Sequence, residues 1–134
     1  MTTTQTWTEW TILHDEGHGI TQRSLEYLEA YLDIVKAMKP YEVIIDFGRT
    51  FSLEIKCERG VVLLSGCNCG YGGTGPHGSV KALEMLLGRR LTPPEEKFIF
   101  THDHVVVSLR SPYKIVYKVS ARPDSKGDSL EVER

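Results

Sequence analysis

The feature that most constrains this chain is a glycine-dense segment at residues 66–79. It reads Gly-Cys-Asn-Cys-Gly-Tyr-Gly-Gly-Thr-Gly-Pro-His-Gly-Ser and holds six of the twelve glycines in the sequence. An apolar run at residues 61–64 precedes it, and a helical pattern at residues 80–87 follows it. A strand, a glycine-rich turn and a helix start in succession can point several backbone N–H groups at one anion. We therefore expect a ligand to contact this segment; the structural alternative is a sharp, closely packed turn.

The length and composition of the chain predict one globular domain of ordinary size. The chain has 134 residues, of which 40% are hydrophobic and 25% charged, and its formal net charge is −2. A chain of this length can bury a core without disulfides or metals. We assign residues 1–120 to a single domain and the polar residues 121–134 to a disordered tail. The slightly negative charge argues against a partner made of duplex nucleic acid.

The cysteines and the N-terminal residues favour the cytoplasm. The chain has three cysteines, and Cys67 and Cys69 are too close for an ordinary disulfide. The first residues, Met-Thr-Thr-Thr-Gln-Thr, carry no apolar signal-peptide core. No apolar stretch approaches the roughly 20 residues that cross a bilayer. We therefore expect a cytoplasmic protein without a membrane partner.

The apolar periodicity predicts an α+β fold, with an antiparallel sheet of five or six strands and two helices packed on one face. Helical spacing falls at about residues 21–38, which Pro40 ends, and from Pro76 to Gly88. Strand patterns fall at residues 7–13, 42–47, 51–58, 61–65 and 113–120, with one or two more strands within 97–110. The three strands within 42–65 are expected to form an antiparallel meander.

The glycine segment supplies most of the candidate ligand contacts. The helix that follows it offers free N–H groups and the positive end of its dipole, Tyr71 can stack on a ring, and nearby basic side chains add charge. The spacing Gly70-x-Gly72-x-x-Gly75 matches a dinucleotide fingerprint, but no parallel strands and crossover helices surround it, and no P-loop lysine is present. The candidate ligand-binding residues are Gly70, Tyr71, Gly72, Gly73, Thr74, Gly75, His77, Gly78, Ser79 and Lys81, with Arg49, Arg59 and Arg110.

Cysteine and histidine pairs offer a competing chemistry. Cys67-x-Cys69 and His102-x-His104 each place two possible zinc ligands on one side of an extended segment. Their spacing differs from that of the usual structural zinc pairs. The chain also lacks a Gly-x-Ser-x-Gly nucleophile elbow. We expect no metal site, no cofactor and no catalytic residues.

A stretch of about 20 residues resembles a motif found in short uncharacterised proteins of bacteria and phages. It consists of residues 70–76, Gly-Tyr-Gly-Gly-Thr-Gly-Pro, and the apolar helix that follows them. Those proteins often carry an aromatic residue before the motif, where this chain has Cys69. Small phage proteins of similar size sequester nucleotide immune signals. By analogy with their size and ligand chemistry, we expect a phage anti-defence protein, which would act in the host cytoplasm.

The sequence is compatible with three functions. The first is a small binding protein that holds a phosphorylated or cyclic-nucleotide-like ligand at the glycine segment and the helix start. The alternative is a protein-interaction module, such as an inhibitor or immunity protein, that uses this segment and the strand with Tyr113 and Tyr117. The second alternative is a nucleotide hydrolase or lyase that uses Cys and His. A homodimer is expected because a small α+β protein with an exposed sheet face often dimerises, and two-fold symmetry is the commonest arrangement of soluble oligomers.

Overall fold

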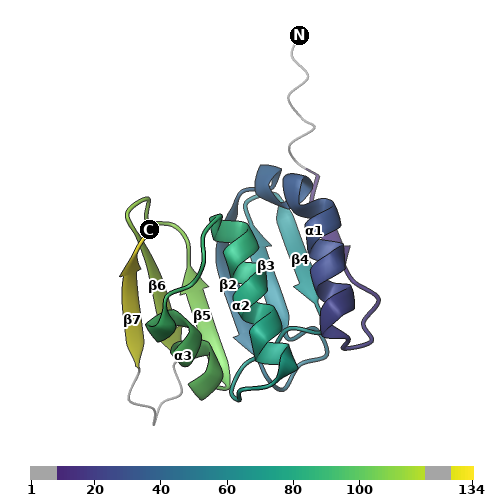
Figure 1. Ribbon diagram of the computed structural model, residues 1–134. Coiled ribbons are helices and arrows are strands. Elements are labelled where there is room, and N and C mark those ends of the chain that lie inside the picture. Colours follow the sequence, from purple (N-terminus) through teal and green to yellow (C-terminus); the bar gives the residue numbers. More distant parts are fainter. Residues whose placement is uncertain (1–8, 120–127) are drawn as a thin grey trace.

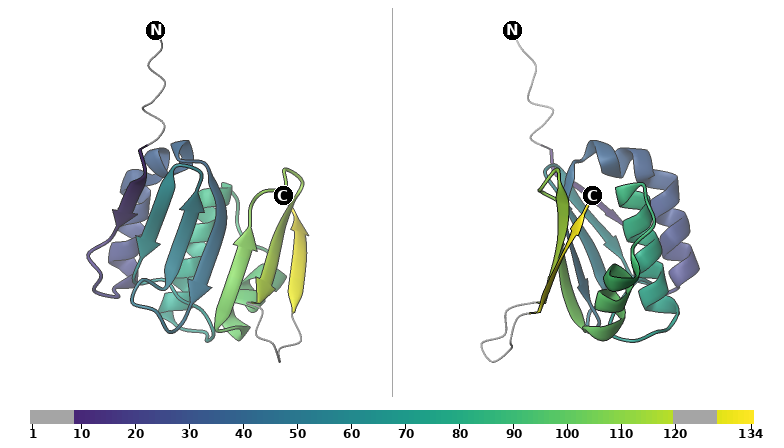
Figure 2. Two further views of the ribbon diagram at one scale, coloured as in Figure 1. Left: turned by 180° about the vertical axis from the view of Figure 1, so that it is seen from behind. Right: turned by 60° about the vertical axis from the view of Figure 1, so that its left-hand side comes forward.

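The computed structural model describes residues 9–119 and 128–134 as a seven-stranded sheet with three helices on one face. The strand order is β1-β4-β3-β2-β5-β6-β7 (Figure 1). Both views in Figure 2 place the helices on the same side, so that the other face of the sheet carries none of the described helices.

The chain passes between the sheet and the helical layer in blocks of consecutive strands or helices. In order they are β1 (Thr11–His14), α1 (Thr21–Ala37), β2 (Pro40–Asp46), β3 (Leu53–Cys57), β4 (Gly60–Leu64), α2 (Thr74–Leu87), α3 (Pro93–Thr101), β5 (His104–Ser108), β6 (Lys114–Val119) and β7 (Ser129–Glu133). None of the helices in the described ranges is long and apolar enough to cross a bilayer.

The predicted fold, an antiparallel sheet of five or six strands with two helices, was wrong. The sheet is mixed, because β1 pairs in parallel with β4 while the other neighbours pair in antiparallel. The predicted disordered tail contains β7, which pairs with β6; the rest of that tail, up to residue 127, lies outside the described residues. A short apolar pattern carries no information on strand direction, which the packing of the whole sheet decides.

The third helix replaces part of the strand expected within residues 97–110. Thr92 is its N-cap: the Thr92 hydroxyl accepts from the Glu95 N–H, and the Glu95 carboxylate accepts from the Thr92 N–H at 2.8 Å. Pro93 and Pro94 occupy the first positions, where a missing N–H costs nothing. The sequence Thr-Pro-Pro-Glu is a capping box, and it was the signal for this helix.

One apolar layer between the sheet and the helices forms the core. The strands alternate buried and half-exposed residues, as the predicted pattern of 51–58 required. The fully buried side chains of this layer include Leu28, Val35, Val43, Ile45, Leu53, Ile55, Val62, Leu64, Leu83, Ile99, Val105, Val107 and Ile115.

A buried carboxylate fixes α3 onto the last strands. Glu95 is fully buried and accepts two hydrogen bonds from Arg89, at 2.8 and 3.1 Å, and one from the Tyr117 hydroxyl at 2.6 Å. Burial alone raises the pKa of Glu95, but the bonds from Arg89, Thr92 and Tyr117 outweigh it and lower that pKa. The carboxylate is therefore charged and fully paired in the folded protein.

Replacement of Glu95 by Ala should lower the free energy of unfolding by about 3 kcal/mol, because the substitution leaves the Tyr117 hydroxyl without its acceptor and Arg89 without its carboxylate partner. Urea denaturation measures this loss. The matched control is Glu96→Ala in the same helical turn, which should change stability by less than about 0.5 kcal/mol. Equal losses in the two variants would contradict the assigned role of Glu95.

The Glu95 carboxylate also predicts how the stability of the fold depends on pH. The pKa of Glu95 is lower in the folded protein than in the unfolded chain. Its contribution is therefore present above the ordinary glutamate pKa and is lost as the pH falls through the folded value. Glu95→Gln should flatten the acid side of the stability curve relative to the native protein.

Candidate functional site

Three connections meet at the end of the sheet where β2 and β4 finish and β5 begins. They are the β2–β3 turn, the segment from β4 to α2, and the turn from α3 to β5. Backbone hydrogen bonds join them: the Gly70 N–H donates to the Ile99 carbonyl at 2.9 Å, and the Phe47 N–H donates to the Asp103 carbonyl at 3.1 Å. The first half of the glycine segment is therefore held between the other two connections.

An open hollow of about 410 Å³ lies where these connections meet, and Phe47, Gly70, Tyr71 and Asp103 line it. The rings of Phe47 and Tyr71 contact edge to face, with centroids 5.8 Å apart and planes at 90°. They are 55% and 42% exposed, which is unusual for large aromatic side chains. The Asp103 carboxylate has no ion-pair or hydrogen-bond partner among the described residues.

Two glycines shape this hollow. Gly70 has a φ of 96°, which disfavours any side chain, and a Cβ there would lie 3.2 Å from the Asp103 Cα. A Cβ on Gly73 would overlap the ring of Tyr71, which therefore lies against the Gly73 backbone. Gly72, between them, has open space around it.

The start of α2 offers a backbone donor beside the hollow. The N–H groups of Thr74 and Gly75 have no acceptor among the described residues, and Pro76 has no N–H. The His77 N–H donates to the Gly73 carbonyl at 3.2 Å, and the His77 Nδ1 lies 2.8 Å from the same oxygen. Thr74 is exposed whereas Gly75 is buried, so the Thr74 N–H is the donor that an anion at this positive helix end can reach.

Hydroxyl groups fix the approach to the hollow, residues 65–69, in a buried position. Thr21 donates to the Gly66 carbonyl at 2.6 Å, and Ser79 donates to the Asn68 carbonyl at 2.6 Å. Ser52 donates to the Cys67 carbonyl, and the Ser24 hydroxyl accepts from the Gly66 N–H. The segment is thus pinned by side chains from α1, α2 and the β2–β3 connection, which makes the hollow rigid.

The second half of the predicted glycine loop is the first turn of α2 and packs inward. Gly75, Gly78 and Ser79 are buried. A Cβ on Gly75 would overlap the side-chain amide of Asn68, and one on Gly78 would overlap the Thr21 methyl group. These residues therefore serve helix packing. The parts of the segment that remain accessible to a ligand are Gly70, Tyr71, Gly73 and the Thr74 N–H, while Gly72 faces open space.

The basic residues named from the sequence do not gather at the site. Arg49 lies at the same end of the sheet, but it pairs with Asp46 and Glu54. Arg59, in the β3–β4 turn, and Arg110, after β5, lie at the opposite end, where Arg110 sits 4.4 Å from the Tyr41 ring centroid. Lys81 is exposed on α2, about 10 Å along the axis from Thr74.

The cysteines lie in the core. Cys67 and Cys69 are fully buried, and burial raises the pKa of each thiol to about 12. Cys57 is also buried, with a pKa of about 11. Such thiols are neither nucleophiles nor ready metal ligands at neutral pH. In the described ranges no three His, Cys, Asp or Glu side chains gather as a metal site.

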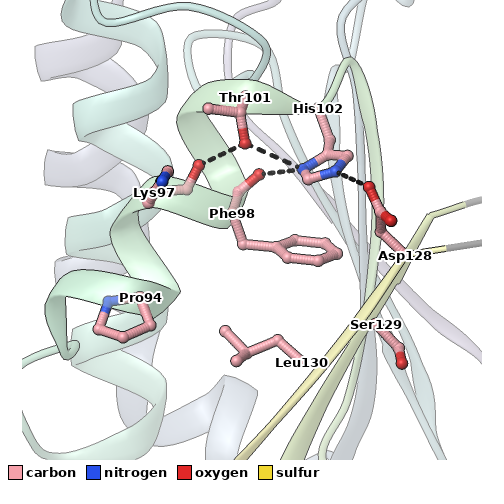
Figure 3. Close-up of a pocket in the computed structure, with 8 residues that line it drawn as sticks. All are labelled: Pro94, Lys97, Phe98, Thr101, His102, Asp128, Ser129 and Leu130. Atoms are coloured by element: carbon pink, nitrogen blue, oxygen red, sulfur yellow. Dashed lines mark hydrogen bonds and ion pairs between the residues drawn. The ribbon is translucent and has the colours of Figure 1, made fainter.

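The histidines of His102-x-His104 have separate partners. His104 bonds Asp46 at 3.0 Å. Figure 3 shows His102 in a second hollow between α3 and β7, where its Nδ1 lies 2.9 Å from the Phe98 carbonyl and its Nε2 lies 3.0 Å from Asp128. The His102 ring stacks on Phe98 at 4.2 Å. The contacts of the two ring nitrogens join Asp128, the residue before β7, to the end of α3.

The tyrosines expected to form a contact patch are also apart. Tyr117 is fully buried beneath α3, whereas Tyr113 is 81% exposed in the connection that precedes β6. Comparisons with protein-family models, with curated protein sequences and with solved structures find no match for this chain.

The sequence did not identify Phe47 or Asp103 as ligand-binding residues. Phe47 follows a strand and precedes Gly48, a position that reads as an ordinary turn. Asp103 is 33 residues from Gly70 in the chain, and no spacing rule connects them. Only the order of the strands, with β5 beside β2, brings these two side chains to Tyr71.

Replacement of Gly66 by Ala should lower the free energy of unfolding by about 3 kcal/mol. Its Cβ would lie 2.5 Å from the Ile20 carbonyl carbon and the Thr21 nitrogen, which are backbone atoms that cannot move independently. Gly72→Ala is the control and should be nearly neutral, because its surroundings are open. Similar melting temperatures for the two variants would show that the buried approach is not tightly packed.

The burial of the thiols predicts their reactivity. Iodoacetamide at mildly alkaline pH should label none of the three cysteines of the native protein and all three in urea, as counted by intact mass. Rapid labelling of Cys67 or Cys69 without denaturant would show an accessible thiolate, contrary to the packing described above.

Proposed function

We propose that this protein binds a small nucleotide-like ligand in the hollow formed by Phe47, Gly70, Tyr71 and Asp103. The observation that carries the proposal is the exposed aromatic pair of Phe47 and Tyr71, held rigidly beside the start of α2. A planar ring packs against these side chains, and its N–H groups donate to the unpaired Asp103 carboxylate. The volume of the hollow lies in the range of small-molecule sites.

A phosphate of the same ligand accepts a hydrogen bond from the exposed Thr74 N–H at the start of α2. This phosphate contact contributes less to the binding free energy than the stacked ring of the ligand does. A base stacked on an aromatic side chain contributes about 1–3 kcal/mol, whereas the end of a helix contributes about 0.3–1 kcal/mol to an exposed charge. The absence of nearby unpaired arginines among the described residues leads to the same ranking, so the ring side of the hollow decides affinity.

Sequestration is the specific role that we propose, following the resemblance of residues 70–76 to the motif of small bacterial and phage proteins. The buried cysteines give no support to the alternative of a Cys–His hydrolase or lyase. The separation of Tyr113 from the buried Tyr117 gives none to a tyrosine-strand contact patch. We therefore favour a protein that holds a nucleotide signal in the cytoplasm without altering it.

The first test is a ligand panel. The native protein is incubated with cyclic di- and trinucleotides, cyclic ADP-ribose isomers and nucleoside monophosphates, and the melting temperature is followed. A ligand at a hundredfold excess over its Kd stabilises the fold by about 2.7 kcal/mol, which raises the melting temperature by several degrees. Recovery of unchanged ligand after denaturation supports sequestration, and recovery of a product supports catalysis. No shift with any member of the panel contradicts the proposal.

A matched pair of glycine variants locates the site. Gly73→Ala displaces the Tyr71 ring, because the new Cβ occupies the place of that ring. It should weaken binding at least about tenfold, since it moves one stacking surface. Gly72→Ala adds the same methyl group to open space and should change the Kd by less than about twofold. Equal affinities of the two variants in calorimetry would place the ligand elsewhere.

A further inference from the structure

Large apolar side chains gather at one edge of the molecule, where β1 and α1 lie. Eight large hydrophobic side chains of the described residues are exposed, and five of them come from β1, α1 or the residue before each: Trp10, Ile12, Ile20, Tyr31 and Ile34. Trp10 and Ile12 are 61% and 58% exposed. This concentration at one edge is typical of an interaction surface.

The apolar side of α1 lies towards β1. Ser24 on α1 donates to Asp15, the residue after β1. Burial raises the pKa of Tyr27, and a hydrogen bond with the His14 backbone opposes the rise, so this ring also lies beside β1. Tyr27 and Tyr31 contact each other at 4.7 Å, and Ile20 and Ile34 share their helical stripe through the seven-residue spacing.

The outer side of β1 has a free backbone. β1 is the terminal strand of the sheet (Figure 2). Thr11 and Asp15 donate their N–H groups to the Arg59 and Leu63 carbonyls at 3.1 and 3.2 Å. Backbone groups alternate in direction along a strand, so those of Trp10, Ile12 and His14 point away from β4. Trp10 and Ile12 present their donors and acceptors to a further strand, and His14 presents its carbonyl, because the His14 N–H is bonded to Tyr27.

We propose that a second copy of this chain pairs in antiparallel with β1, with the two-fold axis at Ile12. Residues with outward-pointing backbone groups form the hydrogen-bonded pairs of an antiparallel ladder. Ile12 then lies opposite Ile12 of the second copy, and Trp10 lies opposite His14 of the second copy. The two α1 helices flank the axis on the helical face and bury Tyr27, Tyr31 and Ile34 against each other. The two sheets become one continuous sheet.

The charges of the two edges favour β1 over β7 for self-pairing. β1 itself contains no charged side chain. The proposed register does bring Glu9 opposite Asp15 of the second copy, but this pair lies outside β1, and the Asp15 carboxylate is already bonded to Ser24 and to the Ser65 N–H. β7 carries Glu131 and Glu133, and two copies of it would face each other with negative charges. Charged residues on an edge strand protect it from pairing, and only the β7 edge has them. A second copy therefore fits β1.

The test is the molar mass in solution. Sedimentation equilibrium of the native protein should give the mass of two chains at high concentration, with dissociation on dilution. Ile12→Lys places two ammonium groups opposite each other on the axis and should raise the dimer dissociation constant at least about a hundredfold. Tyr31→Lys should raise it through the helical contact. Tyr113→Lys is the matched control, because its side chain is exposed elsewhere, and it should leave the constant unchanged.

Circular dichroism of each variant at low concentration shows that the chain remains folded, and Tyr31→Lys decides the question if Ile12→Lys unfolds. A native protein with the mass of one chain at every concentration overturns the proposal. It is also overturned if the Ile12 or Tyr31 variant dimerises as well as the Tyr113 control. Ligand binding in the hollow does not depend on this interface, so the two proposals succeed or fail separately.

Discussion

The close passage of residues 65–69 between the two long helices and the sheet is the constraint on which the rest of the structure depends. Gly66 lies so near the backbone of Ile20 and Thr21 that a side chain there has no space. Its buried polar groups are satisfied by the hydroxyl of Thr21 and that of Ser24. A buried backbone needs such partners, because each unpaired group costs the free energy of a lost hydrogen bond.

This passage determines the position of the candidate site. It delivers Gly70 to the backbone of Ile99 and sets the start of α2. The exposed part of the glycine segment is therefore short, and it forms one wall of a hollow whose other walls are Phe47 and Asp103. Preorganised walls reduce the entropy lost on binding, which is how a small open site can reach useful affinity.

The sequence predicted individual helices and strands well wherever the apolar periodicity agreed with the proline and glycine residues that end such elements. The alternation at residues 51–58, the stop at Pro40 and the end of α2 at Gly88 are all present in the structure. The direction of β1 and the inclusion of β7 could not be predicted, because both depend on packing across the whole sheet. The helix after Thr92 could have been predicted from its capping box.

The glycine segment shows the limit of reasoning from one motif. Its glycines look alike in the sequence, yet Gly78 makes room for α1 whereas Gly73 makes room for the Tyr71 ring. Their neighbours make this difference: Thr21, which is distant in the chain, in the first case, and Tyr71 of the same segment in the second. The arginines illustrate the same point, because Arg49 and Arg59 both lie in turns of one meander but at opposite ends of the sheet.

The most direct test of the account is an amide-resolved NMR titration of the native protein with the ligand panel. The account predicts saturable shifts for the amides of residues 70–75, Phe47 and Asp103, with none at Arg59 or Arg110 at the far end of the sheet. Saturable shifts centred on that far end, or no saturable shift with any nucleotide, would contradict it.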